Sequence, residues 1–295
     1  MNTLLRPREV KHLLDRSVGC SMPDAVTLGM PHLCLHGLSE TWLLKECGHR
    51  HWLMLAAAAG IDAPDFRDST GDPIYAAFLS VSIRDAALET ACEHARLVFA
   101  SRLARISRTR FMSLHRLSVA GRSIGEITMT STFVRRAQEG RNHGIVRIEV
   151  PTLRHVALDP EAAARAAETA TLRSSQWGRH LGFEQSRAKI IDRCVVDPCP
   201  GQDFNGADFL YFASYQAFVD RAEWAFLRPR FATTRWRDIV YRGNVDPGER
   251  VAITLLELSQ DTECLRHWYR LEREQDAAII ADVFTRRSMV GSAAG

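Results

Sequence analysis

The sequence predicts an α+β fold made of two similar units, each a long apolar helix followed by a run of long strands. Residues 203–224 join a polar turn to an aromatic-rich helix that is apolar on nearly every side, which indicates a buried helix. Residues 35–52 align with residues 204–221 without a gap, and strand patterns follow both segments. A helix wrapped by an antiparallel sheet is a hot-dog unit. We therefore expect a double hot-dog formed by tandem duplication.

The turn before the second helix contains the first candidate site. Asp203 and Asn205 are residues whose side chains fold back onto backbone amides, and Gly206 permits a left-handed or closely approached backbone. We expect the helix to begin at this turn, with the N–H groups of Gly206 and Ala207 pointing outward. Such amides would form an oxyanion site.

The upstream copy supplies the matching residues of the first unit. His36 and Gly37 align with Asn205 and Gly206, and Trp42 aligns with Tyr211. Gly37 is therefore a second oxyanion candidate. His36 is a candidate acid or base, with a packed or capping histidine as the alternative. Asp203 and Asn205 likewise have the alternative of simple helix caps.

Strand and turn patterns divide the chain into an N-terminal unit (residues 1–150), a linker (151–184) and a C-terminal unit (185–295). Glycine-rich and polar stretches separate the segments, including a turn at 119–125. A short helix is expected at 10–14 and another, with Pro160 at its start, at 159–171. The strands are expected within residues 74–83, 88–119, 123–136, 190–197, 238–241, 250–258, 262–272 and 277–286.

Composition limits the class of protein. The chain has 295 residues, of which 46% are hydrophobic and 25% charged, enough to bury a core in two domains. The longest uncharged apolar run, residues 52–61, is too short to span a bilayer, and the charged N-terminus lacks a signal-peptide core. We expect a cytoplasmic protein with no membrane partner. Its 7 cysteines form no C-x-x-C pair, which favours reduced thiols.

The basic residues are nearly all arginine, which suits phosphate recognition. Genome composition is the alternative explanation for this bias. One local cluster consists of Arg102, Arg105, Arg108 and Arg110. It lacks interleaved aromatic residues, so a solvated strand edge is favoured over a nucleic-acid site.

Histidines and cysteines near the first helix superficially resemble a metal site. The residues concerned are His32, Cys34, His36, Cys47, His49 and His51. No second cluster matches them at zinc-like spacing, so we expect packed or surface histidines and no metal.

Several enzyme classes lack their motifs here. Glycine-rich phosphate loops are absent, which argues against nucleotide enzymes. The G-x-S-x-G string at 121–125 leads into a strand pattern instead of the helix that a hydrolase nucleophile elbow requires. The dehydratase motif H-x-x-x-G-x-x-x-x-P is also missing.

Two families resemble parts of this chain. The string D-F-N-G at 203–206, followed by Tyr211 and Phe212, resembles the helix start of hot-dog acyl-CoA thioesterases, except that Ala207 and Asp208 replace a His and further Asn residues. A closer resemblance is to the LnmK-like bifunctional acyltransferase/decarboxylase family of polyketide biosynthesis. The segments that resemble this family are 71–78, 205–206, 210–215, 219–220 and 241–246.

The resemblance implies an enzyme that takes a malonyl or methylmalonyl group from coenzyme A, decarboxylates it and loads an acyl carrier protein. It implies that Tyr75 is the acylated residue. From the two helix starts we further expect Asn205 and His36 to be catalytic, and Asp203 and Tyr211 to lie in the substrate pocket. An ordinary strand aromatic is the alternative for Tyr75. No cofactor is implied beyond the coenzyme A thioester and the carrier's phosphopantetheine, and a homodimer is left open.

The proposed chemistry explains these residue types. Loss of CO₂ from a malonyl thioester leaves an enolate, whose oxygen needs hydrogen-bond donors nearby. A tyrosine nucleophile needs a lowered pKa or a neighbouring base. The alternatives are a hot-dog thioesterase or dehydratase-like enzyme, and a catalytically inactive acyl-binding module of a synthase complex.

Overall fold

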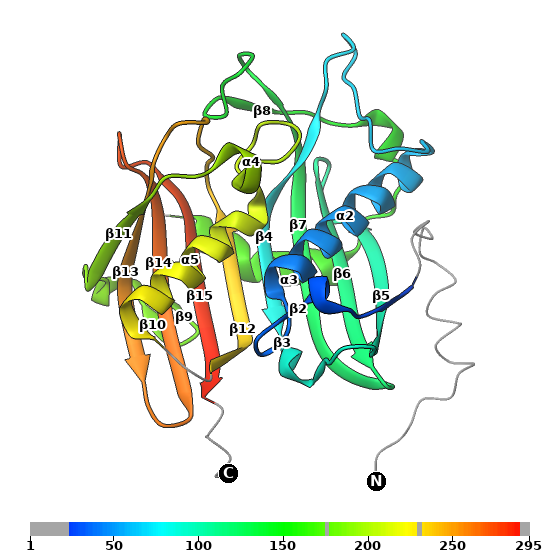
Figure 1. Ribbon diagram of the computed structural model, residues 1–295. Helices are drawn as coiled ribbons and strands as arrows, with labels where there is room; N and C mark the ends of the chain where they lie inside the picture. The colour runs from blue at the N-terminus through cyan, green and yellow to red at the C-terminus, as the bar shows by residue number, and fades with distance from the viewer. Residues whose placement is uncertain (1–23, 175–176, 229–231, 290–295) are drawn as a thin grey trace.

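The computed structural model describes residues 24–174, 177–228 and 232–289, which form one long antiparallel sheet with two long helices on one face (Figure 1). The helix predicted at residues 10–14 lies outside the described residues. Within them, no helix is long and apolar enough to cross a membrane.

The first unit places a 20-residue helix before its four long strands. Its elements are β1 (Ala25–Thr27), β2 (Leu33–Cys34), β3 (Gly37–Leu38), α2 (Glu40–Ala59), β4 (Tyr75–Arg84), β5 (Arg96–Arg105), β6 (Arg110–Val119), β7 (Arg122–Arg136) and β8 (Ile145–Arg147), with short 3₁₀ turns η1 (Met30–His32) and η2 (Leu88–Thr90).

The second unit repeats this order. After η3 (Pro151–Leu153), α3 (Pro160–Ala170), η4 (Thr171–Arg173), β9 (Arg179–His180), β10 (Phe183–Glu184) and η5 (Gln185–Arg187), it comprises β11 (Asp192–Val196), α4 (Pro200–Asp203), α5 (Phe212–Leu227), β12 (Ala232–Tyr241), β13 (Val251–Gln260), β14 (Cys264–Arg273) and β15 (Ile279–Met289).

Strand pairing joins the units into a continuous sheet. The strand order is β1-β5-β6-β7-β4-β12-β15-β14-β13-β11, and β4 and β12 meet at the centre. These two strands pair only from Ser80–Val240 to Ile83–Arg237. The sheet therefore has the same arrangement on both sides of its central pair, which is the double hot-dog.

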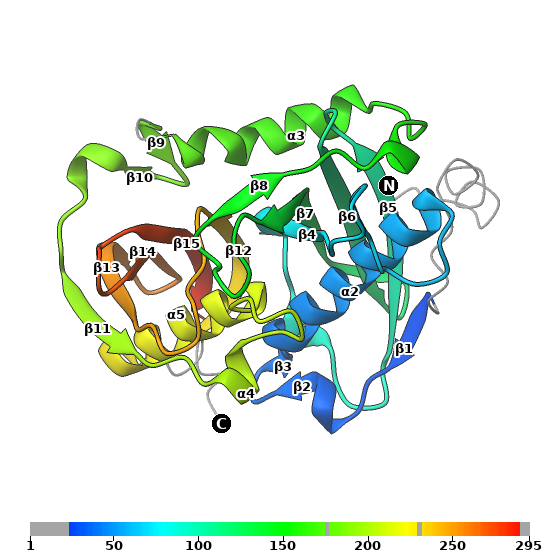
Figure 2. The same cartoon turned by 90° about the horizontal axis from the view of Figure 1, so that it is seen from above.

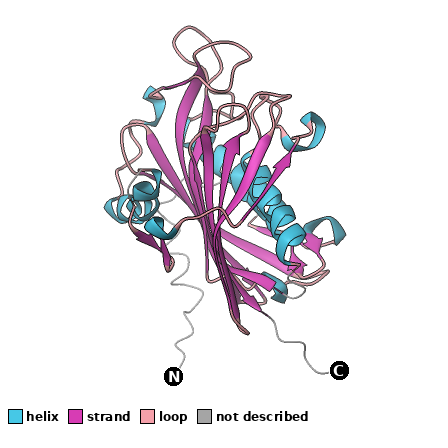
Figure 3. Ribbon diagram, turned by 90° about the vertical axis from the view of Figure 1, so that its left-hand side faces the viewer, coloured by secondary structure: helices cyan, strands magenta, loops and turns pink. Residues whose placement is uncertain are grey.

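The two long helices lie on one face of the sheet and pack against each other (Figure 3). Their core contains Leu44 and Cys47 of α2 and Phe218 of α5, all at most 1% exposed. A Cβ atom at Gly48 would lie 2.6 Å from the ring of Phe212, so glycine permits this close approach of the helices.

The opposite face of the sheet is covered by α3 (Figure 2). Asp159 caps this helix by accepting a hydrogen bond from the Ala162 N–H, and Pro160 occupies its first position. The helix predicted at 159–171 is confirmed.

The predicted strands are confirmed with changes at their ends. The segment expected at 88–119 is two strands, β5 and β6, and the strand expected at 238–241 begins at Ala232. The largest correction concerns the second helix, which begins at Phe212 and not at Asn205–Gly206. The two helix starts also do not align as the sequence suggested. The N-cap residue of α5 is Tyr211 and that of α2 is Ser39, whereas the sequence alignment placed Trp42 opposite Tyr211.

Candidate active site

A cavity of about 580 Å³ lies where the two units meet. β4 begins five residues before its first pairing with β12, so residues 75–78 pair with β7 on one side and with no described strand on the other. The cavity lies along this free edge. It is bounded by α2, the start of α5, and the segments that precede α5 and follow β12.

Five of the residues predicted from the sequence line this cavity. They are Tyr75, Asn205, Gly206, Ala207 and Tyr211. Tyr75 and Tyr211, which are 136 positions apart in the chain, thus line the same cavity because β4 passes beside the segment that precedes α5. The other three, His36, Gly37 and Asp203, do not line it.

Asn205 forms a turn of its own before α5. Its side-chain Oδ1 accepts hydrogen bonds from the N–H groups of Ala207 at 3.0 Å and Phe209 at 3.2 Å. The Ala207 amide, predicted as an oxyanion donor, is therefore already bonded within the turn. Gly206 does not have a positive φ; the left-handed residue here is Asp208, at φ 58°.

The N-terminus of α5 is the helix start that faces the cavity. Tyr211 holds the N-cap position without making a side-chain cap, and no acidic residue lies in the first turn. Both Tyr211 and Phe212 line the cavity. No side chain thus caps this helix start, which lies six residues after the position predicted from the sequence.

Asp203 acts behind the cavity. Its carboxylate accepts a hydrogen bond from Cys199 N–H at 2.9 Å, and its carbonyl accepts from Tyr211 N–H at 2.7 Å and from the Ser214 hydroxyl at 3.0 Å. These bonds fix the chain that enters α5. Asp203 was predicted to lie in the substrate pocket, but it does not line the cavity and instead positions the segment that enters α5.

His36 and Gly37 lie in the β2–β3 hairpin, outside the cavity lining. Gly37 has a φ of 99°, and a Cβ atom there would collide with the carbonyl oxygen of Leu88. What approaches this glycine is therefore the backbone of η2 and not a substrate. The oxyanion site predicted at Gly37 is corrected to a close contact of the protein with itself.

Tyr75 stands in an aromatic corner of the cavity. Its ring lies 5.4 Å from that of Phe209 and 6.5 Å from that of Trp52, measured between centroids. Tyr75 lines the cavity, and within the described part of the chain its hydroxyl makes no hydrogen bond.

Arg136 organises this corner and was not singled out from the sequence. Its guanidinium lies 4.0 Å above the Phe209 ring and 5.8 Å from the Tyr75 ring. It donates to Asn142 Oδ1 at 2.9 Å and to the carbonyl of Ala207. A single cation thereby joins β7 to the Asn205 turn. Its position at the end of a strand offered no motif.

Two further tyrosines of the cavity are held by the protein. The Tyr215 hydroxyl donates to the Gly243 carbonyl at 2.8 Å, and the Tyr241 hydroxyl donates to the Phe212 carbonyl at 3.0 Å. Burial raises the pKa of both phenols, and that of Tyr211 as well. These three side chains therefore remain protonated donors at neutral pH.

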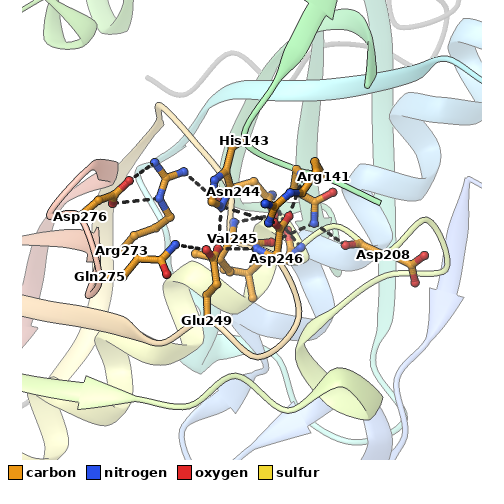
Figure 4. Close-up of polar contacts among 12 residues, drawn as sticks. Arg141, His143, Asp208, Asn244, Val245, Asp246, Glu249, Arg273, Gln275 and Asp276 are labelled. Atoms are coloured by element: carbon orange, nitrogen blue, oxygen red, sulfur yellow. Dashed lines mark hydrogen bonds and ion pairs between the residues drawn. The ribbon is translucent and has the colours of Figure 1, made fainter. Parts of the chain in front are cut away.

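A latch of polar contacts holds the cavity wall together (Figure 4). The Asn142 N–H donates to Asp246 Oδ1 at 2.6 Å, and Arg141 pairs with Asp246 Oδ2 at 3.1 Å. The amide of Asn244 is bonded to Leu210 through both its oxygen and its nitrogen. The latch ties the end of β7, the Asn205 turn and the segment after β12 to one another.

Among the described residues, three side chains of this latch are close enough together to hold a metal ion. His143, Asp246 and Glu249 offer ligand atoms within 4.8 Å of one another. Their atoms are already bonded, with His143 Nε2 at 2.6 Å from Glu249 Oε2 and Arg141 on Asp246. The histidines singled out in the sequence do not gather: His51 is buried between the hydroxyls of Ser113 and Ser131, at 2.8 Å from each.

The ionisable side chains of the cavity lining include several basic groups and, within the described residues, no acidic ones. Arg147, Arg173 and Arg242 line it, and His49 and His143 add two imidazoles. No aspartate or glutamate is among the described residues that line it. Negative groups are therefore favoured as ligands over positive ones.

No protein-family model matches the chain, and no curated protein matches it. Solved structures do. The chain resembles a putative oleoyl thioesterase from Lactobacillus plantarum, with 14% identity, TM-score 0.63, and coverage of 90% of this chain and 95% of that one. It also resembles the 12:0-ACP thioesterase of Umbellularia californica, with 9% identity, TM-score 0.57, and coverage of 89% and 92%.

An acyl-ACP thioesterase from Bacteroides thetaiotaomicron gives the same result, with 9% identity, TM-score 0.57, and coverage of 89% and 96%. Each likeness spans nearly the whole of both chains. The double hot-dog fold predicted from the sequence is confirmed.

Proposed function

We propose that this protein is an enzyme that cleaves acyl thioesters bound in the cavity between its two units. The observation that carries the proposal is the uncapped N-terminus of α5, which opens onto the same cavity as the free hydroxyl of Tyr75. Attack on a thioester carbonyl places negative charge on its oxygen. The positive end of a helix is suited to stabilise that charge.

Hydrolysis is the first candidate reaction. It is supported by the fold and length shared with solved proteins that are named as oleoyl and acyl-ACP thioesterases. The lining supplies His49 and His143 as groups that could accept a proton from water. The latch at His143 would hold such a base against Glu249, 2.6 Å away.

Acyl transfer with decarboxylation is the second candidate, and two observations favour it. Tyr75, the residue that the LnmK-like family implies as the acylated one, lines the cavity. The described lining also holds arginines without carboxylates, which suits a malonyl or methylmalonyl group. In this reaction the acyl group would pass from coenzyme A through Tyr75 to a carrier protein.

The test is to incubate the protein with long-chain, malonyl and methylmalonyl thioesters of coenzyme A and of a carrier protein. Mass spectrometry then weighs the protein, the carrier and the small products. A free acid indicates hydrolysis, and an acylated carrier that has lost CO₂ indicates transfer with decarboxylation. If the wild-type protein cleaves none of these thioesters, the proposal is wrong.

Tyr75→Phe separates the two reactions. If Tyr75 is acylated, transfer and the mass-shifted enzyme both disappear, while stability changes by only about 1 kcal/mol. Tyr269→Phe is the matched control, because Tyr269 is buried in the core, does not line the cavity, and its hydroxyl has no hydrogen-bond partner among the described residues. Equal rates in both variants would leave Tyr75 an ordinary strand aromatic.

A further inference from the structure

A second, smaller cavity adjoins the first beneath α3. It has a volume of about 280 Å³ and lies between α3 and the strands β4, β6 and β7. Leu79 and Arg173 line both cavities, so the two meet at these residues. Arg110 lines the second cavity, and Arg147 lines the first.

Strand register places Arg110 and Arg147 on the same side of the sheet. Arg110 pairs with Thr132 and Arg147 pairs with Val134, which are two residues apart on β7. Cross-strand partners share a face, and so do residues i and i+2 of a strand. The two arginines therefore flank the end of β7 on the face that α3 covers, where β8 passes (Figure 2).

Arg173 completes the group from η4. One of its guanidinium nitrogens donates to the carbonyl of Leu79 at 3.3 Å and to the carbonyl of Tyr241. These two bonds fix the guanidinium beside the free edge of β4. Burial, together with the charges of Arg242, Arg147 and Arg110, lowers the pKa of Arg173 to about 10.

The neighbouring arginines already have partners, unlike Arg110 and Arg147. Arg242 pairs with Asp282 at 2.7 Å. Of the sequence cluster that includes Arg110, Arg102 pairs with Asp159, Arg105 donates to the Arg154 carbonyl, and Arg108 pairs with Glu149. Within the described residues, the side chains of Arg110 and Arg147 make no ion pair or hydrogen bond.

No aspartate or glutamate among the described residues lines either cavity, so these cations lack a counter-charge from the walls. We propose that Arg110, Arg147 and Arg173 form a binding site for the phosphate of a phosphopantetheine thioester. Guanidinium groups bind phosphate through paired hydrogen bonds, and an exposed Arg147 would meet the phosphate at the cavity mouth. The pantetheine arm would then run along the free edge of β4 toward Tyr75. This inference rests on the proposed function and names its substrate class.

The direct test is calorimetric binding of 4′-phosphopantetheine and of pantetheine, which differ only in the phosphate. We expect the wild-type protein to bind 4′-phosphopantetheine more tightly. Arg110→Gln and Arg147→Gln should each weaken that binding about tenfold and leave pantetheine binding unchanged. Arg122→Gln is the matched control, because Arg122 is exposed at the opposite end of β7 and makes no described side-chain contact.

Coenzyme A and a phosphopantetheinylated carrier protein both contain this phosphate, and parallel titrations with each identify the source. Equal affinities for the two small probes, or an Arg122→Gln effect as large as the others, would overturn the assignment. The assignment would also be wrong if the arginine variants weakened binding of malonyl-pantetheine but not of 4′-phosphopantetheine. The arginines would then bind the carboxylate of the acyl group instead of the phosphate. Failure of the proposed function has a different signature, namely no cleavage of any thioester whatever the binding results.

Discussion

The two long helices begin in opposite surroundings. At the start of α2, Ser39 caps the helix by accepting from Trp42 N–H, and the Glu40 carboxylate pairs with Arg237 at 3.0 Å. At the start of α5 no side chain forms a cap, and Phe212 packs against Phe78 with 4.5 Å between ring centroids. One helix start is closed by its own protein, and the other faces a cavity.

The polar groups beneath the two helices differ as well, but in the opposite sense. His51 and Glu223 are each the twelfth residue of their helix. His51 belongs to a neutral chain of hydrogen bonds that runs Ser101, His115, Ser113, His51, Ser131. Glu223 belongs to a charged network with His267, Arg287, Asp220 and Arg237.

Under the proposed function, the difference between the two helix starts explains why only the start of α5 would face a substrate. Charges that pair with one another at the start of α2 fill the space that a ligand would need. The aromatic and uncapped start of α5 leaves that space available. We therefore expect changes at the closed end to affect stability, and changes at the open end to affect activity.

Breaking the charged network at the closed end should give the largest effect. Arg237 is fully buried and pairs with both Glu40 and Asp220. Arg237→Met would leave the Glu40 carboxylate without its cation and Asp220 with Arg287 alone, so we expect a loss of about 3–5 kcal/mol in unfolding free energy. Urea denaturation measures it, with Arg122→Met as the exposed control. A loss below about 1 kcal/mol would show that this network does not hold the closed end together.

Giving the open end the residue of the closed end should reduce activity. Phe212→Glu copies the acid at the first position of α2 into the first position of α5. The new carboxylate would oppose negative charge on the thioester oxygen. We expect kcat/KM for acyl thioesters to fall about 100-fold below that of Phe212→Gln, or about 2.7 kcal/mol.

Phe212→Gln serves as the matched uncharged control, since it makes the same change in shape and polarity. Equal rates in the Glu and Gln variants would argue that charge at the start of α5 plays no part in the reaction.

The buried His51 and His115 and the buried Glu223 should respond to different pH ranges. Burial lowers the pKa of His51 and His115 from 6.5 to about 3. The unfolded chain binds these protons near pH 6.5 and the folded protein does not, so stability falls as the pH drops from 6.5 toward 3. The expected slope is about 1.4 kcal/mol per pH unit for each ring.

In the other unit, burial raises the pKa of Glu223, but the charges of Arg287 and His267 outweigh it and lower the pKa from 4.5 to about 2. The ionised Glu223 carboxylate therefore contributes to the unfolding free energy above pH 4.5, and this contribution is lost between pH 4.5 and 2. His51→Asn should therefore reduce the slope between pH 6 and 5, whereas His49→Asn, an exposed neighbour on α2, should not. An unchanged slope in His51→Asn would place the titrating groups elsewhere.

The sequence predicted the fold well because its main signals are local. Alternation along the strands and the apolar surface of residues 212–227 need no knowledge of distant contacts. The candidate site was predicted in part. Tyr75, Asn205 and Tyr211 were singled out from motifs, and the fold brings them to one cavity.

The remaining site residues depend on distant contacts that no motif records. Asn142 lines the cavity, and Arg136 contacts the Phe209 ring, only because β7 ends beside the Asn205 turn. The closed and open helix starts could not be told apart either, since the partner of Glu40 lies 197 residues away at Arg237. Helix starts were also misplaced because the Asn205 turn uses the same residue types as a helix cap.

The two glycines aligned from the sequence should respond unequally, and this is the smallest effect we expect. Gly37→Ala places a side chain at a φ of 99° and against the Leu88 carbonyl, so we expect a loss of about 1–2 kcal/mol in stability. Gly206→Ala meets no atom within 4 Å and no positive φ, so its stability should change by less than about 0.5 kcal/mol. Thermal denaturation of both variants decides the comparison. If Gly206→Ala is as stable as the wild type yet loses turnover, the added methyl group obstructs the substrate, and Gly206 is needed for close approach of the thioester. If stability and turnover are both unchanged, Gly206 is only part of the turn, and the oxyanion site belongs to the start of α5 alone.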